Sequence, residues 1–392
     1  MSEQIHGSPL VPRLRGFGSN IFAEMSALAT AEGAINLGQG FPDTDGPAEV
    51  LEAAVDAIHE GHNQYPPVRG IPVLREAIAT HQRNRYGLTW DLETEIVVTA
   101  GANEAMTATI LATCESGDEV LLIEPAFDSY WVAIAMAGAK PVAVPLTGPD
   151  QRVDVERLAA SVTDRTRLII VNSPHNPSGR VFDADELEGI ATIARERDLL
   201  VVTDEVYEHL TFDDAVHLPI ATLPGMRERT ISISSAGKTF SVTGWKIGWA
   251  CAPAPLVQAV QTVKQFMTFV NGAPFQYAIA RGLLLPPERF EQIRADLQRG
   301  RDLLVPGLQA AGLQVLPSQG TYFVTADISP LGETDGHEFC RSLPRRCGVA
   351  AVPSQVFYAD PYPRPLVRFA VCKQPEVLAE AADRLAGLNL PT

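Results

Sequence analysis

Short apolar segments alternate with amphipathic segments through the middle of the chain. Val, Ile and Leu dominate the apolar segments, and the amphipathic segments between them, such as residues 186–197, have helical spacing. Apolar strands separated by helices predict a mainly parallel sheet that helices cover on both faces. The predicted strands are residues 96–99, 119–123, 141–145, 167–172, 199–204, 230–234 and 246–252.

The hydrophobic pattern changes on either side of this region. Before it, residues 50–58 and 73–82 carry apolar side chains at i, i+3 and i+4, which predicts two helices. After residues 286–287, a long helical pattern precedes the strand-like segments GTYFVTADI and LVRFAVCK. A last helix is predicted to begin at Pro375, because proline is favoured in the first turn of a helix.

These patterns predict two parts with separate cores. We expect a large domain over residues 51–283, with a seven-stranded sheet, and a smaller α/β domain over residues 284–392. The N-terminal segment, residues 1–50, is expected to join the smaller domain. The sequence contains no internal repeat or low-complexity linker, so the two parts are expected to pack tightly.

Composition and charge narrow the class of protein. The 392 residues are 46% hydrophobic and 20% charged, as in ordinary globular enzymes, and the net charge of −16 disfavours nucleic acid and anionic membranes as partners. No apolar run is long enough to span a bilayer, and the first residues lack the pattern of a secretory signal. The five cysteines form no CxxC pair, so we expect reduced thiols in a cytoplasmic protein and no metal site.

The segment SSAGKTFSVTGWKIGW, residues 234–249, contains the triplet Gly237-Lys238-Thr239, which is similar to the end of a phosphate-binding P-loop. A P-loop requires glycine five residues before the Gly-Lys pair, and that position is Ser232, inside a predicted strand. This excludes a P-loop. Lys238 and Lys246 therefore require another explanation.

Chemically suitable residues follow several of the predicted strands. Because the binding crevice of a parallel sheet lies at the carboxyl ends of its strands, these residues are expected to meet there. They are Gly101, Ala102 and Asn103 after the first strand, Phe127 after the second, Asn176 after the fourth, Asp204 and Tyr207 after the fifth, and Ser235 and Lys238 after the sixth.

Pyridoxal 5′-phosphate would use all of these residue types. It requires a lysine amine, a carboxylate beside its pyridine nitrogen, donors to its 3′-oxygen, an aromatic ring against its face, and a helix N-terminus with cations for its phosphate. Each residue alone has a structural explanation: Asp204 could cap a helix, Lys238 could be solvated, and Phe127 could lie in a core. Their joint placement at successive strand ends favours the cofactor.

The chain resembles the class I and II aminotransferases of pyridoxal-phosphate fold type I, whose fold is aspartate aminotransferase-like. Within them it is most similar to the kynurenine aminotransferase and glutamine transaminase K branch, which includes bacterial N-succinyldiaminopimelate and methionine aminotransferases. The resemblance covers nearly the whole length. It rests on NIFAEMSALA, NLGQGFPD, NQYPP, LIEPAFDSY, NSPHNPSG, TDEVYEHL, SSAGKTFSVTGWKIGW and LVRFAVCK.

The resemblance implies roles for residues that contact the cofactor ring. Lys238 would be the Schiff-base lysine and proton shuttle, and Asp204 would pair with the pyridine nitrogen. Tyr207 and Asn176 would hold the 3′-oxygen, and Phe127 would stack on the ring.

The resemblance also implies contacts to the phosphate and to the substrate. The phosphate would be held by Gly101, Ala102, Asn103, Ser235 and Lys246, and by Tyr65 of the neighbouring subunit in a homodimer with shared sites. Arg368 would clamp the substrate carboxylate with help from Gly40 and Asn176, and Phe22 would be an aromatic of the pocket.

Two further residues have less specific expectations. His175, where many relatives carry asparagine, is expected to be a neighbouring helper residue. Arg69, four residues after Tyr65, is expected to be an exposed or interface ion-pair partner and is the one candidate second cation for an acidic substrate.

The expected reaction is transfer of an amino group from an L-amino acid to a 2-oxo acid by ping-pong kinetics. Phe22, Tyr130 and residues 269–272 are expected to form a neutral pocket suited to methionine, glutamine, kynurenine or aromatic amino acids. An N-succinyldiaminopimelate aminotransferase and a cysteine-conjugate β-lyase remain alternatives, since they would use the same residues. A DNA-binding regulator is disfavoured by the acidic chain, and a nicotinamide oxidoreductase by the absence of GxGxxG after the first strand.

Overall fold

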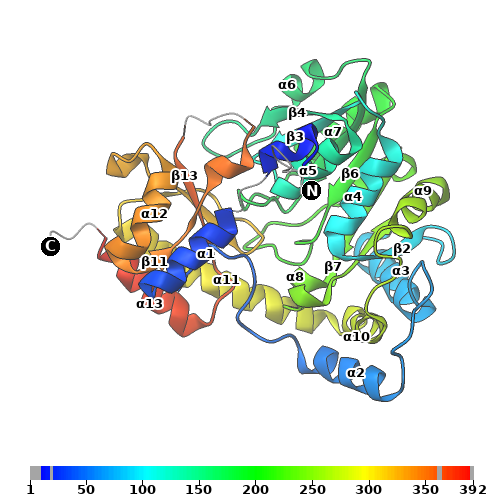
Figure 1. Ribbon diagram of the computed structural model, residues 1–392, viewed down its shortest axis with the longest axis horizontal. Coiled ribbons are helices and arrows are strands. Elements are labelled where there is room, and N and C mark those ends of the chain that lie inside the picture. Colours follow the sequence, from blue (N-terminus) through cyan, green and yellow to red (C-terminus); the bar gives the residue numbers. More distant parts are fainter. Residues whose placement is uncertain (1–9, 18–20, 360–363, 389–392) are drawn as a thin grey trace, which may run out of the picture.

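A seven-stranded sheet forms the larger part of the molecule (Figure 1). The structure is a computed structural model that describes residues 10–17, 21–359 and 364–388. The strand order is β2-β8-β7-β6-β5-β3-β4, and β8 alone runs antiparallel to its neighbours β2 and β7. The strands are β2 (Ile96–Ala100), β3 (Glu119–Glu124), β4 (Lys140–Pro145), β5 (Thr166–Asn172), β6 (Leu200–Asp204), β7 (Thr230–Ser235) and β8 (Ile247–Cys251).

All seven strands predicted from the apolar pattern are present, and no strand end differs from its prediction by more than one residue. Strand β8 begins at Ile247 and not at the predicted Lys246, because Lys246 has a left-handed backbone with φ of 55°. The prediction of an α/β fold with a mainly parallel sheet is confirmed.

Helices cover both faces of this sheet, because alternate side chains of each strand point to opposite faces. Val120 and Leu122 of β3 pack in one core with α4, α5 and α9, whereas Leu121 and Ile123 pack in another with α6 and α7. The helices of this part are α2 (Ala48–His59), α3 (Pro72–Tyr86), α4 (Gly101–Thr113), α5 (Asp128–Ala137), α6 (Val155–Ala160), α7 (Ala184–Glu196), α8 (Ala236–Thr239), α9 (Ala254–Lys264) and α10 (Ala273–Leu283).

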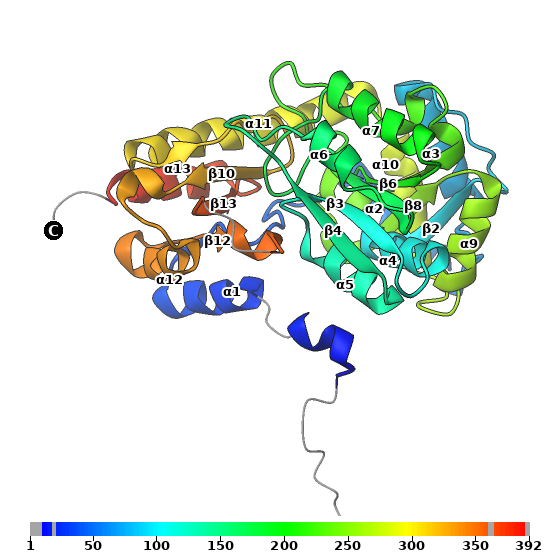
Figure 2. The same cartoon turned by 90° about the horizontal axis from the view of Figure 1, so that it is seen from above.

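A smaller antiparallel sheet has the order β12-β13-β10-β9. The N-terminal strand β1 pairs in parallel with β11, and α1 lies beside α12 in both views (Figure 1 and Figure 2). The elements here are α1 (Ile21–Glu32), β1 (Ile35–Asn36), β9 (Gln314–Val315), β10 (Phe323–Asp327), α12 (Gly336–Cys347), β11 (Val349–Ala350), β12 (Val352–Pro353), β13 (Leu366–Ala370) and α13 (Pro375–Ala386). This packing supports the proposal that the N-terminal segment belongs with the C-terminal part.

Helix α11 (Pro287–Ala310) joins the two parts. Phe290, near its start, packs in the core formed with α2, α3 and α10, whereas Leu304 and Leu308 pack in the core of the small sheet. Short 3₁₀ helices complete the described chain: Pro12–Phe17, Ile220–Thr222, Arg227–Arg229, Thr243–Trp245, Ser329–Leu331 and Ser354–Phe357. Within the described residues, no helix combines the length and the apolar character that crossing a bilayer requires.

Candidate active site

A cavity of about 450 Å³ lies at the carboxyl edge of the large sheet, where the small sheet meets it. Its walls come from both parts of the molecule and from the N-terminal segment. Every predicted site residue except Tyr65 lines it: Phe22, Gly40, Gly101, Ala102, Asn103, Phe127, Asn176, Asp204, Tyr207, Ser235, Lys238, Lys246 and Arg368.

The direction of β8 explains how Lys246 reaches this cavity. Because β8 is antiparallel, it begins at the edge where the parallel strands end, and its first residues pair with the last residues of β2 and β7. Lys246 immediately precedes this strand and therefore lies beside the start of α4. The prediction that both lysines of the motif serve one site agrees with this placement.

The start of α4 forms a cradle suited to an anion. Gly101 has φ of 76°, and a Cβ built on it would lie 3.1 Å from Nζ of Lys246. A Cβ on Gly248 would lie 2.6 Å from the carbonyl carbon of Gly101, so β8 and α4 touch through backbone atoms. The N-cap residue Ala100 supplies no side-chain cap to the helix. Helix N-terminal amides and an ammonium group thus face the same small space, which favours a phosphate.

Asp204, the last residue of β6, is buried with a hydrogen-bonded carboxylate. Its Oδ2 accepts a hydrogen bond of 2.5 Å from the Tyr130 hydroxyl, and its Oδ1 accepts one of 3.2 Å from the backbone N–H of Val206. Burial raises the pKa of the Asp204 carboxyl, and the hydrogen bond from Tyr130 opposes this rise. A turn and not a helix follows Asp204, so the helix-cap interpretation does not apply.

Lys238 lies on the short helix α8 beside two aromatic rings. Its Nζ is 5.6 Å from the centroid of Tyr322 and 6.0 Å from that of Tyr207. Burial lowers the pKa of the Lys238 amine to about 8. The residue is therefore not a solvated surface lysine, and its amine can act as a nucleophile or base near neutral pH.

Arg368 is a buried guanidinium on β13 with one nitrogen unused. It donates 2.9 Å to Oδ1 of Asn176 and 3.2 Å to the carbonyl oxygen of Gly38, and it lies 3.9 Å from the centroid of Phe323. Its Nε has no partner among the described residues. Burial lowers the pKa of Arg368 to about 10. A buried guanidinium without a bonded carboxylate is a strong site for a carboxylate ligand.

Some predictions about the surroundings of the cavity need correction. Tyr130 lines the cavity as expected, but its hydroxyl is bound to Asp204, a partner that the sequence analysis missed. The sequence holds no signal for this bond, because a tyrosine in the first turn of the apolar helix α5 is equally compatible with a core position. Residues 269–272 do not line the cavity of their own chain; Asn271 instead donates to the backbone oxygens of Thr99 and Lys246.

Tyr65 and Arg69 lie away from the cavity of their own chain. Tyr65 is 83% exposed and makes an edge contact with Phe269 at 5.6 Å. Arg69 donates to the carbonyl oxygen of Thr94 and to Oε1 of Gln258, each at 3.2 Å. The structure of one chain therefore brings neither residue to the other predicted site residues.

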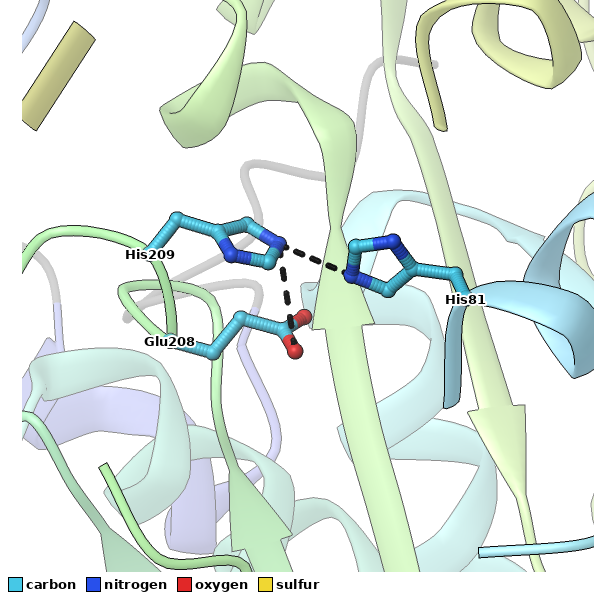
Figure 3. A group of neighbouring side chains, drawn as sticks. All are labelled: His81, Glu208 and His209. Carbon is cyan, nitrogen blue, oxygen red and sulfur yellow. Dashed lines mark hydrogen bonds and ion pairs between the residues drawn. The ribbon is translucent and has the colours of Figure 1, made fainter. Parts of the chain in front are cut away.

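A second group of buried polar side chains is formed by His81 of α3 and by Glu208 and His209, which directly follow Tyr207 in the chain (Figure 3). Nε2 of His81 and Nε2 of His209 are 3.2 Å apart, and Glu208 accepts hydrogen bonds from Tyr86 at 2.7 Å and from Ser234 at 2.5 Å. Nε2 of His209 also lies 3.9 Å from Oε2 of Glu208. Nδ1 of His209 has no partner within the described chain, whereas metal-bound histidines donate from their second nitrogen. These contacts are those of a hydrogen-bonded histidine pair.

A family model described as aminotransferase class I and II matches residues 32–385. The chain is 52% identical to a probable N-succinyldiaminopimelate aminotransferase of Mycobacterium tuberculosis over 96% of this chain and 98% of that protein. It is 42% identical to the methionine aminotransferase of Escherichia coli over 97% and 99% of the two chains.

Solved structures give the same result. The N-succinyldiaminopimelate aminotransferase of Mycobacterium tuberculosis superposes with a TM-score of 0.94, covering 97% of this chain and 100% of that one at 52% identity. A mutant of the Thermus thermophilus aspartate aminotransferase superposes with a TM-score of 0.89, covering 97% and 100% at 33% identity.

Proposed function

The chain belongs to the class I and II aminotransferases and has their aspartate aminotransferase-like fold, and from this premise we propose that its cavity binds pyridoxal 5′-phosphate and uses it to transfer the amino group of a neutral L-amino acid to a 2-oxo acid. The observation that carries the proposal is the meeting of Lys238, Asp204 and Arg368 around one cavity. These three residues come from three separate segments of the sequence, and none of the segments alone would require the three side chains to meet.

The residues present fit the cofactor. The cradle of α4 amides and Lys246 offers the right charge for the phosphate, and Gly101 leaves room that a side chain would fill. We assign Ala102, Asn103 and Ser235 to the same group. We assign Phe127 to the face of the ring and Asn176 and Tyr207 to the ring oxygen, since all three line the cavity.

When bound, pyridoxal phosphate supplies an aldehyde for the amine and a ring that accepts electrons from the α-carbon. Lys238 would anchor it. Once the substrate amine has displaced Lys238 from the aldehyde carbon, the freed Nζ would move the proton from the substrate α-carbon to that carbon. Asp204 would keep the ring nitrogen protonated, and for this its own carboxyl must be ionised. The hydrogen bond from Tyr130 supports that ionised form against the effect of burial. Arg368 orients the substrate through its α-carboxylate, with Gly40 and Phe22 beside it.

The cationic residues that line the cavity leave no positive charge for an acidic substrate side chain, which favours a neutral one. Among its described lining residues the cations are Lys238, Lys246 and Arg368, and each already has an assigned partner. Asp128 also lines the cavity and would repel a further carboxylate. We therefore expect kcat/KM for methionine, glutamine, kynurenine or aromatic amino acids to exceed that for aspartate by at least about tenfold.

A second candidate substrate is N-succinyldiaminopimelate, a longer molecule with more carboxylates. It is favoured by the 52% identity to the probable N-succinyldiaminopimelate aminotransferase. Its distal carboxylates would require a cation from the neighbouring subunit, and Arg69 is the candidate. β-Lyase activity on cysteine conjugates is the third possibility. It is separated from transamination by measuring pyruvate released without an oxo-acid acceptor.

We further propose a cytoplasmic homodimer with shared sites, in which the exposed Tyr65 reaches the phosphate bound by the neighbouring chain.

Replacement of Lys238 tests the proposed chemistry. Purified wild-type protein should absorb visible light from bound cofactor, and borohydride should fix that cofactor covalently to the chain. Lys238→Ala should abolish the covalent link, measured by mass spectrometry of peptides. Lys246→Ala is the matched control, since it removes an ammonium from the phosphate and leaves the link possible. Cofactor fixed to the Lys238→Ala chain would assign the anchor to another lysine and refute this mechanism.

A further inference from the structure

Glu208 is a buried carboxylate that directly follows Tyr207 in the chain. Tyr207 lines the cavity, whereas Glu208 does not, and Glu208 is 3% exposed. Its Oε1 accepts a hydrogen bond of 2.5 Å from the hydroxyl of Ser234 in β7. Its Oε2 accepts one of 2.7 Å from the hydroxyl of Tyr86 at the end of α3. One carboxylate thus attaches the turn after β6 to two other elements.

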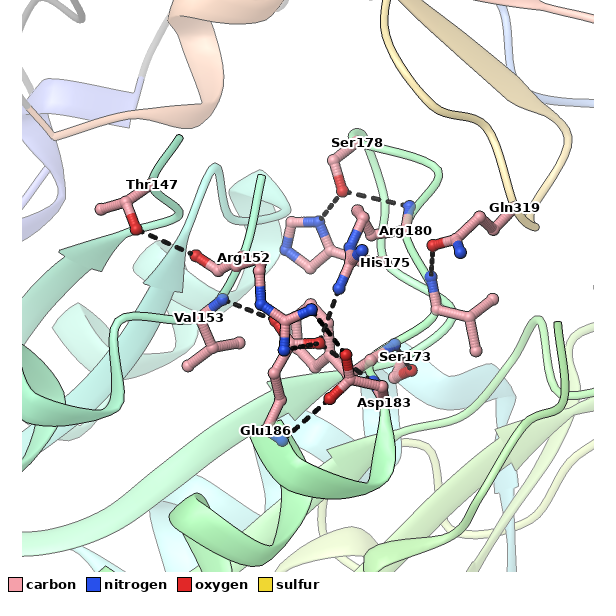
Figure 4. A network of polar contacts seen from close by, with 12 residues as sticks. Thr147, Arg152, Val153, Ser173, His175, Ser178, Arg180, Asp183, Glu186 and Gln319 are labelled. Atoms are coloured by element: carbon pink, nitrogen blue, oxygen red, sulfur yellow. Dashed lines mark hydrogen bonds and ion pairs between the residues drawn. The ribbon is translucent and has the colours of Figure 1, made fainter. Parts of the chain in front are cut away.

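The partners of Glu208 differ from those of another buried carboxylate, Glu186. Figure 4 shows that Glu186 accepts a hydrogen bond of 2.6 Å from the guanidinium of Arg180. Among the described residues, the ion-pair contact of Glu208 is with His209 alone, at 3.9 Å (Figure 3). Burial holds the pKa of the His209 ring well below its ordinary value, so this ring is neutral. Because burying a carboxylate without a cation costs free energy, Glu208 is poorly suited to a purely stabilising role.

The backbone pairing of β6 with β7 ends before Tyr207. The last bond of this ladder runs 2.8 Å from the N–H of Glu205 to the carbonyl of Ile233, and Tyr207 lies two residues beyond it. The hydroxyl oxygen of Ser234 is 3.4 Å from the carbonyl of Glu205 but 2.5 Å from Glu208, so its hydrogen is directed to Glu208. The bond between Glu208 and Ser234 therefore holds the turn to β7 past the end of the ladder.

Both segments that this bond joins carry residues assigned to the cofactor. Ser234 precedes Ser235, which we assign to the phosphate, and Glu208 follows Tyr207, which we assign to the ring oxygen. The distance between these two groups is limited by the covalent structure of pyridoxal phosphate. A site that holds both groups therefore needs a fixed spacing between Ser235 and Tyr207, and hydrogen bonds behind the contacting residues can provide it.

We propose that Glu208 is a positioning residue that, through its bond to Ser234, sets the position of the Tyr207 hydroxyl relative to the phosphate site. The proposal rests on the proposed cofactor. The bond from Tyr86 attaches the same carboxylate to α3, which supplies no residue to the cavity. Loss of the Ser234 hydroxyl should therefore disturb the bound cofactor, whereas loss of the Tyr86 hydroxyl should affect only stability.

The readout is the pH at which the absorbance of the bound cofactor changes. Around this pH the nitrogen that joins the cofactor to Lys238 loses its proton, and the negative ring oxygen then depends on donors from the protein. A hydrogen bond from Tyr207 stabilises the deprotonated form, so displacement of Tyr207 should raise the midpoint. Tyr207→Phe gives the largest shift that loss of this donor can cause.

Ser234→Ala and Tyr86→Phe form a matched pair of variants. Each removes one hydroxyl from the same carboxylate and leaves Glu208 in place, so their thermal unfolding temperatures should fall by similar amounts. We expect Ser234→Ala to raise the midpoint of the absorbance change by at least about half a pH unit. Tyr86→Phe should leave the midpoint within about 0.2 pH units of wild type.

Two substitutions of Glu208 itself repeat the test without its carboxylate. Glu208→Gln offers an amide oxygen and an amide N–H to the two hydroxyls, whereas Glu208→Met has a similar length and neither group. Both variants lack the negative charge, so their difference reports the hydrogen bonds alone. The midpoint of Glu208→Met should lie at least about half a pH unit above that of Glu208→Gln, and this comparison decides if Ser234→Ala does not fold.

The outcomes distinguish this inference from the proposed function. Wild-type protein without the absorbance of bound cofactor would refute the proposed function itself. If Tyr207→Phe shifts the midpoint and folded Ser234→Ala does not, only the positioning role of Glu208 fails. Without a shift in Tyr207→Phe, the inference falls together with the assignment of Tyr207 to the ring oxygen. Equal shifts in Ser234→Ala and Tyr86→Phe would show that any loosening of the turn has this effect, which overturns the specific link to β7.

Discussion

Asp204 and Lys238 are ionisable residues whose buried surroundings oppose the charge they would carry in water. Burial raises the pKa of the Asp204 carboxyl and lowers that of the Lys238 amine to about 8. For the chemistry proposed here, the carboxyl must be charged and the amine must be neutral when it attacks. Burial therefore favours the neutral amine that Lys238 needs but disfavours the charged carboxylate that Asp204 needs. Only Asp204 requires a neighbour that stabilises its charged form.

Tyr130 is that neighbour, and removing its hydroxyl should expose the effect. In Tyr130→Phe the carboxyl loses a hydrogen bond to its charged form, so its pKa should rise further. The half-reaction should slow by about tenfold or more, since a hydrogen bond to a charged group contributes ~1.5–3 kcal/mol. Single-turnover absorbance measures the rate. Asp204→Ala should be slower still, and a Tyr130→Phe variant with the wild-type rate would remove Tyr130 from this role.

The lowered pKa of Lys238 predicts a pH dependence for cofactor uptake by the apoenzyme. The amine attacks only when it is deprotonated, so the rate constant should rise as pH increases through about 8 and then level off. An unperturbed lysine, with its higher pKa, would give a rate still rising at pH values about two units higher. Stopped-flow absorbance over this pH range tests the difference. A curve without a plateau would contradict the burial effect.

For individual site residues, the sequence predicted which side chains take part but not all of the hydrogen bonds that they form. Lys238 and Asp204 were predicted because a lysine and a carboxylate at successive strand ends are a rare combination, whereas Arg368 was implied by the family resemblance of the segment LVRFAVCK. The hydroxyl of Tyr130 was not, since a buried tyrosine on an apolar helix is equally a core residue until its partner is known.

Among the secondary-structure elements, β8 and α4 together form the phosphate cradle. Their contact is made by Gly101 and Gly248, where a Cβ would collide with the opposing backbone or with Lys246. The positive φ of Gly101 adds a second requirement for glycine. The apolar pattern of residues 246–252 predicted a strand, but alternation does not encode direction. The antiparallel course of β8, which brings Lys246 to the site, could therefore not be predicted from it.

Gly101→Ala tests the cradle. The Cβ would displace the tip of Lys246 and strain the start of α4, so affinity for pyridoxal phosphate should fall about tenfold. Affinity for pyridoxal, which lacks the phosphate, should change little, and this comparison is the internal control. Equilibrium dialysis measures both. Equal losses for the two ligands would mean that the substitution damages the fold and not the cradle.

Across the whole molecule, the cavity needs the two sheets and the N-terminal segment together. Arg368 comes from the small sheet, whereas Phe22 and Gly40 come from the N-terminal segment on either side of β1. The homologous motifs predicted this assembly residue by residue, whereas the hydrophobic pattern predicted only that two cores exist. Tyr65, exposed in a single chain, is the residue whose role depends on a second copy of the chain.

Arg69 provides the prediction that separates the candidate substrates. In one chain its guanidinium is held by Thr94 and Gln258, outside the cavity. Arg69→Ala should therefore leave kcat/KM for methionine within about threefold of wild type. A loss above about tenfold that is confined to N-succinyldiaminopimelate would show that Arg69 reaches a neighbour's substrate and would favour the second candidate. Light scattering of the same samples tests whether the active species is a dimer.

The hydrogen bond between Arg368 and Asn176 joins residues 192 positions apart, and the bond from Arg368 to Gly38 spans 330. Contacts so distant in sequence close large loops and are slow to form. The large sheet can pair its strands before β13 is in place, but the carboxylate clamp cannot exist until nearly the whole chain has been synthesised and both its ends have docked. The substrate-binding half of the cavity should thus mature last during folding, after the half that holds the phosphate.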